Sequence, residues 1–82
     1  MHFQVRLYTP QGVVSPDEIP ELVDYRKRID GGEVYHAFTT PYHARKALHE
    51  YCTAVPVIAI GGEVIRIDNV GHYRTVYRFA NR

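Results

Sequence analysis

The sequence has one cysteine, no tryptophan and a formal net charge of only +1. One cysteine excludes an internal disulfide and a four-cysteine zinc site. The near-zero charge argues against bulk electrostatic attraction to nucleic acid or anionic lipid. No segment approaches the ~18 consecutive apolar residues of a membrane-spanning helix, and residues 1–8 lack the layout of a secretion signal. We therefore expect a cytoplasmic protein with no membrane association.

Motifs that carry chemistry are equally scarce. No phosphate-binding glycine loop and no nucleophile paired with a base stands out. The five histidines include no pair at i, i+4 and no HExxH arrangement, so a zinc site would need ligands from separate elements. We expect no metal and no other cofactor.

The composition that remains is that of a folded domain. The chain has 82 residues, of which 45% are apolar, and this size fits one small domain over 1–82. Alternating apolar and polar side chains predict a strand over residues 2–8. Ser15 and Pro16 begin a helical pattern, whose regular part we expect to start nearer Pro20 and to end at 30–32.

The middle of the chain repeats this alternation of elements. Residues 33–38 read as a second strand, and Thr40 with Pro41 forms the start of a second helix of about three turns. Residues 55–60 form an apolar run typical of a strand that is buried on both faces. Gly61 and Gly62 then predict a hairpin turn into a further strand over 63–67.

The C-terminal segment fits two structures. Its apolar residues match a helical stripe, and they also alternate as in a strand. We favour a helix, because Asp68 or Asn69 can cap it and a helix buries more of the apolar side chains. The predicted order is β-α-β-α-β-β-α, an α/β domain with a four-stranded mixed sheet whose first crossover is parallel.

Two segments resemble the glutaredoxins of the thioredoxin fold. Residues 5–9, with Gly12 three positions on, resemble the first strand and the loop that leads to the active site. Residues 54–62 resemble the segment that holds the cis-proline of the family, its buried strand and its glycine turn. The resemblance implies a thioredoxin-like fold, and it implies a cis bond at Val55–Pro56, with Pro56, Gly61 and Gly62 as structural residues.

The same resemblance implies a loss of redox activity. Glutaredoxins carry a Cys-x-x-Cys motif between that loop and the first helix, where the helix N-terminus lowers a thiol pKa. Val13 and Pro16 stand at the two matching positions, and neither carries a thiol. Cys52 is the only remaining thiol. It is either a buried core residue, the interpretation we prefer, or the centre of a monothiol redox or transferase enzyme.

A cluster of arginine and tyrosine near the C-terminus is the strongest binding signal. In a helix, Arg74, Arg78 and Arg82 would line one face at i, i+4 and i+8. The candidate binding residues are Tyr42, Arg66, Tyr73, Arg74, Tyr77, Arg78 and Arg82. Arginine and tyrosine are common anchors of protein interfaces, and the combination also holds phosphates and stacks bases. A third interpretation is a solvated face with tyrosine stems packed on the sheet.

These observations favour a non-catalytic binding protein over an enzyme. The leading hypothesis is a redox-inactive glutaredoxin-like domain that binds another protein and would suit an inhibitor or adaptor made by a phage or mobile element. Homodimerisation through the same surface is an equal alternative. Two further alternatives are an enzyme that uses Cys52 and a weak nucleic-acid binder that uses the C-terminal helix.

Overall fold

The sheet of this protein is built mainly from strands near the two ends of the chain, with one two-residue strand from its middle. The computed structural model describes residues 1–80. In chain order the elements are β1 (His2–Thr9), β2 (Gly12–Val14), the 3-10 helix η1 (Pro16–Glu18), α1 (Pro20–Asp30), β3 (Ala37–Phe38), α2 (Pro41–Ala54), β4 (Gly61–Ile67) and β5 (Tyr73–Ala80). The architecture is a small α/β domain, as the sequence predicts.

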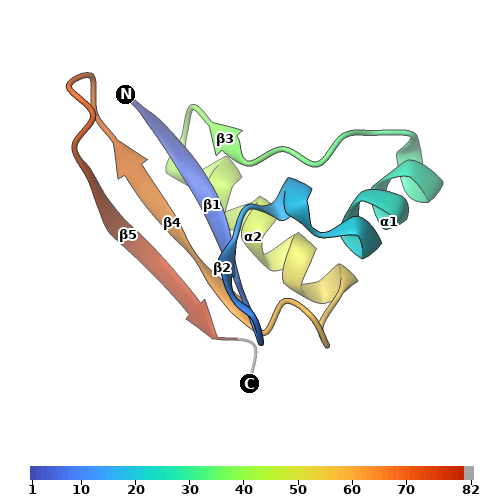
Figure 1. The fold of residues 1–82 in the computed structure, drawn as a ribbon. Coiled ribbons are helices and arrows are strands. Elements are labelled where there is room, and N and C mark those ends of the chain that lie inside the picture. The colour runs from blue at the N-terminus through green and yellow to red at the C-terminus, as the bar shows by residue number, and fades with distance from the viewer. Residues whose placement is uncertain (81–82) are drawn as a thin grey trace.

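All strand pairings are antiparallel. The strand order is β2-β1-β4-β5, and β3 also pairs with β1. Strands β2 and β3 therefore share one edge of β1, while β4 occupies its other edge. Strand β5 forms the far edge of the sheet (Figure 1).

The two faces of the sheet differ in what covers them. Helices α1 and α2 both lie on one side of the sheet, and the other side carries no helix (Figure 1). Because residues directly opposite each other share a face, Val5 and its partner Val64 mark the helix-covered face, and Arg6 and its partner Glu63 mark the open face. The helix-covered face holds the core, which includes Val5, Leu7, Leu22, Leu48, Cys52 and Val64.

Local signals at the helix ends work as the sequence predicts. Helix α1 spans Pro20–Asp30 and is capped by Gly31, whose φ of +66° is a left-handed conformation that glycine adopts readily. Helix α2 begins after Thr40, whose Oγ1 accepts a hydrogen bond from the His43 amide at 3.2 Å. The strand predicted over residues 2–8 is also confirmed, since β1 spans His2–Thr9.

The predicted C-terminal helix is wrong. Residues 73–80 form strand β5, which pairs antiparallel with β4 across a tight turn, where Gly71 has a φ of +89°. A helix would leave this edge of β4 without a partner, whereas a strand satisfies its backbone groups. The sheet is therefore antiparallel with five strands, and the thioredoxin-like topology with four mixed strands is not confirmed.

The segment between α2 and β4 also differs from the prediction. Residues 55–60 form a turn, in which the Val55 carbonyl accepts from the amides of Ile58 at 3.1 Å and Ala59 at 2.8 Å. The chain has to reverse here to carry α2 back to the sheet. Pro56 lies exposed in this turn, and the Val55–Pro56 bond is trans.

Gly61 and Gly62 are strand residues and not a hairpin turn. Both are buried in β4, and neither has a positive φ. A Cβ at Gly62 would lie 2.5 Å from the carbonyl oxygen of Arg6, and one at Gly61 would lie 2.5 Å from that of Phe79. These glycines are needed because neighbouring backbone passes too close for a side chain. The strand predicted over 33–38 is shorter in the structure, where β3 spans only Ala37–Phe38.

Candidate functional site

Strand β5 leaves one long edge of the sheet open. It spans eight residues and pairs with β4 alone among the described strands. The opposite edge of the sheet is interrupted: β2 and β3 have three and two residues, and the Val5 amide between them donates to the His36 carbonyl at 2.8 Å. The β5 edge is thus the place where unpaired backbone groups can accept another strand.

The hydrogen bonds of the β4–β5 turn show which amides face outward. The Asp68 amide donates to the His72 carbonyl at 2.9 Å, which makes these two residues a hydrogen-bonded pair. Such pairs alternate along an antiparallel ladder. The Arg74 backbone therefore faces β4, while the N–H groups of Tyr73 and Thr75 point to the open edge.

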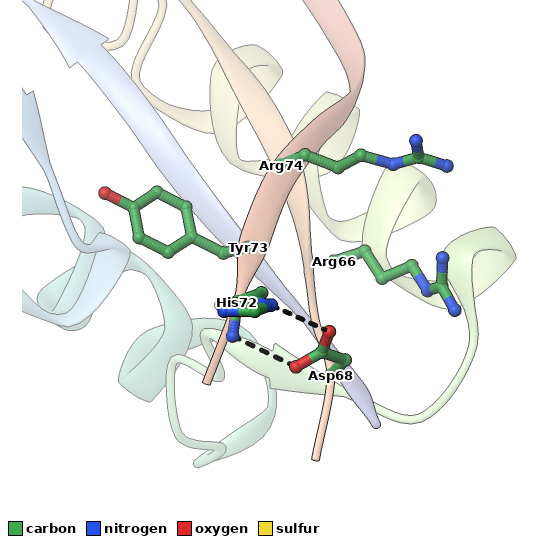
Figure 2. Close-up of a pocket in the computed structure, with 5 residues that line it drawn as sticks. All are labelled: Arg66, Asp68, His72, Tyr73 and Arg74. Atoms are coloured by element: carbon green, nitrogen blue, oxygen red, sulfur yellow. Dashed lines mark hydrogen bonds and ion pairs between the residues drawn. The ribbon is translucent and has the colours of Figure 1, made fainter. Parts of the chain in front are cut away.

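Two arginines lie side by side at this end of the strand pair. Arg66 on β4 and Arg74 on β5 are direct cross-strand partners. Their side chains extend on the same side of the strands, whereas the Tyr73 ring extends on the other (Figure 2). Together they line a shallow pocket of about 210 Å³.

The nearest carboxylate is engaged elsewhere. Asp68 Oδ1 accepts from the amides of Val70 and His72, each at 3.0 Å, and its Oδ2 lies 3.9 Å from His72 Nδ1. Asp68 thus holds the turn together. Within residues 1–80, neither arginine forms an ion pair, and Arg66 Nε instead donates to the Met1 sulfur at 2.9 Å.

A groove between α2 and β5 continues the same side of the sheet. Tyr42, Arg45, Lys46, His49 and Tyr77 line it around a volume of about 380 Å³. Tyr77 is half-buried: its hydroxyl is hydrogen-bonded to His49 Nε2 at 2.7 Å, and Arg45 Cζ lies 5.5 Å from the centre of its ring. The Tyr77 ring is therefore a structural part of the groove and not a free stacking surface.

The open face of the sheet carries a second polar cluster. The Tyr8 hydroxyl donates to Glu63 Oε1 at 2.7 Å. Burial, followed by this carboxylate, raises the pKa of Tyr8 above its ordinary value of 10.0. Arg6 Cζ lies 5.8 Å from the centre of the Tyr73 ring. Tyr8 is thus already paired with Glu63 on this face, and Arg6 with Tyr73.

The structure separates the binding residues that the sequence groups together. A bulge at Val76 reverses the facing of the side chains, because Ile65 pairs with Thr75 and Val64 with Tyr77. Arg74 and Tyr77 therefore lie on the helix-covered face, whereas Arg78, paired with Glu63, lies on the open face with Tyr73. Tyr42 and Tyr77 line the same groove, and Arg66 and Arg74 are cross-strand partners. Arg82 lies outside the described residues.

Three residues of the groove are absent from the predicted set. Arg45, Lys46 and His49 follow Tyr42 at i+3, i+4 and i+7, which is the spacing of one helical face. This second stripe on α2 was visible in the sequence. The sequence did not show that this stripe lies beside the C-terminal segment, because the predicted C-terminal helix would not have packed against it as β5 does.

Cys52 has the environment of a core residue. Its side chain is 0% exposed, and burial raises the pKa of the thiol to about 11. A thiol with this pKa stays protonated near neutral pH, whereas a reactive cysteine needs a lowered pKa and access to solvent. This geometry supports the core interpretation of Cys52.

Other classes of site find no support in the part of the chain that the structure describes. Residues 1–80 contain no group of three or more metal-ligating side chains. None of their helices has the length and apolar character required to cross a membrane. A comparison of the chain with protein-family models, curated proteins and solved structures finds no match.

Proposed function

We propose that this chain is a non-catalytic binding domain, of the inhibitor or adaptor kind, that binds an extended segment of another protein along β5. The observation that carries the proposal is the open β5 edge. Eight residues of strand offer backbone donors and acceptors to a partner, including the outward N–H groups of Tyr73 and Thr75. Strand addition of this kind takes its affinity from backbone hydrogen bonds and its specificity from the flanking side chains.

The alternatives have less support in the geometry. An enzyme centred on Cys52 would need a thiol that is accessible and ionised, and this one is neither at neutral pH. Single-stranded nucleic acid would need aromatic faces on which bases can stack. The groove offers Tyr42 for this purpose, but the ring of Tyr77 is already held by Arg45 and His49.

Homodimerisation through β5 meets electrostatic repulsion. Residues 73–80 include two arginines and no acidic residue. Pairing β5 with a second copy would therefore bring cations from both chains to one interface without carboxylates from either strand. Like charges that face each other across strands are unfavourable, so a different protein fits this edge better.

A displayed library of random peptides tests the proposal. Peptides selected on the wild-type domain should lose binding to Thr75→Pro and keep it with Thr75→Ala. Both variants lack the threonine side chain, but only proline lacks the outward N–H. Proline is tolerated in an edge strand at such a position, and circular dichroism with thermal unfolding verifies that both variants fold. Equal binding of the two folded variants would contradict strand addition at β5.

A further inference from the structure

We infer that the segment bound at β5 is acidic, and that Arg66 and Arg74 together bind one of its carboxylates. This inference rests on the proposed function, since the carboxylate arrives on the added strand. Guanidinium groups bind carboxylates through paired, charge-assisted hydrogen bonds. The arginine pair would therefore set both the charge and the register of the partner segment.

The two arginines lack a carboxylate partner among the described residues. They are direct cross-strand partners, and like charges in this position repel. Asp68, the acidic residue that lines their pocket, is held by the amides of Val70 and His72. A bound carboxylate would remove the repulsion that the described residues leave in place.

Both arginines can reach a side chain on a strand that is added to β5. A strand added to β5 would lie about 5 Å from it and about 10 Å from β4. The residue of that strand opposite Arg74 shares its face. A glutamate there lies next to Arg74 and within the span of the long side chain of Arg66, whose guanidinium extends on the same side (Figure 2).

Positive charge continues beyond the arginine pair. Arg45 and Lys46 of α2 line the groove beside β5, and this groove has no acidic lining residue. Glu50, further along α2, lies 3.0 Å from Arg26 in an ion pair with α1. An acidic segment would thus meet cations along the helix side of β5, whereas a basic segment would be repelled.

Two matched peptides test the inference. Both have eight residues, the length of β5, with threonine alternating with glutamate in one and with glutamine in the other. We expect the glutamate peptide to bind about tenfold or more tightly than the glutamine peptide. Arg66→Gln and Arg74→Gln should each remove most of this preference. Arg28→Gln, at the exposed end of α1, should leave the preference intact.

The outcomes separate the inference from the proposed function. If both peptides bind equally and Thr75→Pro abolishes binding, strand addition at β5 is supported and the acidic preference is overturned. If Thr75→Pro and Thr75→Ala bind the glutamate peptide equally, the edge itself is overturned. Three further outcomes would each overturn the arginine-pair assignment. Both peptides fail to bind, or Arg28→Gln and Arg74→Gln lose the preference equally. The third is that a single-stranded oligothymidine binds more tightly than the glutamate peptide.

Discussion

Arg66 and Arg74 lie directly opposite each other on β4 and β5, and neither forms an ion pair with another residue among 1–80. Neighbouring strands lie about 5 Å apart, and both side chains extend on the same side of the strands, so the pairing places two cations beside each other (Figure 2). An arrangement that costs stability and gains no internal ion pair is typical of a binding site. Stability measurements can detect this cost before any ligand is known.

We expect Arg74→Gln to stabilise the domain in low salt. Removing one of two facing charges should raise the free energy of unfolding by about 0.2–1 kcal/mol. Urea unfolding at about 0.01 M and about 1 M ionic strength tests this, because the gain should vanish where the Debye length falls to about 3 Å. A destabilised Arg74→Gln protein in low salt would show that Arg74 makes a favourable internal contact instead.

The same assay on Arg28→Gln provides the control. Arg28 is exposed in the last turn of α1, where a cation interacts favourably with the helix dipole. Its removal should therefore be neutral or slightly destabilising, which is the opposite sign. Stabilisation of equal size in both variants would mean that any loss of positive charge helps, and the pair would have no special role.

The buried thiol of Cys52 predicts a loss of stability in alkali. Its pKa rises from an ordinary 9.0 to about 11 on folding, because burial disfavours the thiolate. Between these values the unfolded chain loses its proton first, so the free energy of unfolding falls by up to about 2–3 kcal/mol. Burial also raises the pKa of Tyr8 and of Tyr51, and both add to this fall above their ordinary 10.0.

Cys52→Ala isolates the contribution of the thiol. This variant should lack the fall that the wild type shows between about pH 9 and about pH 10. Iodoacetamide should label native Cys52 much more slowly than the unfolded chain, since the side chain is 0% exposed. Rapid labelling of the native protein would contradict a buried, protonated Cys52. Identical pH profiles for the wild type and Cys52→Ala would contradict it as well, and either result would favour the enzymatic interpretation.

Position 62 requires glycine because the backbone of β1 passes close to it, and not because of a turn. Gly62→Ala places a methyl group 2.5 Å from the Arg6 carbonyl oxygen and against the Leu48 side chain. Relieving this clash requires β1 and β4 to move apart, and we expect a loss of about 1–3 kcal/mol. Chemical denaturation measures it. A loss below about 0.5 kcal/mol, the range of ordinary surface substitutions, would show that the strands separate more easily than the packing implies.

The contact between His49 and Tyr77 predicts that α2 and β5 stabilise each other. Tyr77→Phe removes the hydroxyl that lies 2.7 Å from His49 Nε2, and this should cost about 0.5–1.5 kcal/mol. A double-mutant cycle with His49→Leu tests the pair. Additive losses would indicate that the hydrogen bond contributes nothing, whereas a smaller combined loss confirms the coupling.

Local physical chemistry made part of the fold predictable. Alternation over residues 2–8 predicts β1, and the Thr40 cap followed by Pro41 predicts the start of α2. The structure of the C-terminus depends instead on a distant partner. Residues 73–80 fit both a helical stripe and a strand, and the free edge of β4 favours the strand. Local patterns in the sequence therefore do not decide between the two structures.

The candidate site was predictable in its residue types and not in its arrangement. Tyr42, Arg66, Arg74 and Tyr77 belong to the predicted set, and they do lie on one side of the sheet. The extra residue at the Val76 bulge turns Arg78 to the other face. The periodicity of the sequence does not predict a bulge, because a bulge depends on how β5 fits against β4.

Amide hydrogen exchange along β5 distinguishes strand addition at this edge from any other mode of binding. In the free protein, the N–H groups of Tyr73 and Thr75 face outward and should exchange faster than that of Arg74, which faces β4. Saturation with the glutamate peptide should slow exchange at Tyr73 and Thr75 by about tenfold or more, as expected for newly formed strand hydrogen bonds. If the peptide binds and exchange at Tyr73 and Thr75 is unchanged, the peptide is not added to β5 as a strand and the proposed function is wrong.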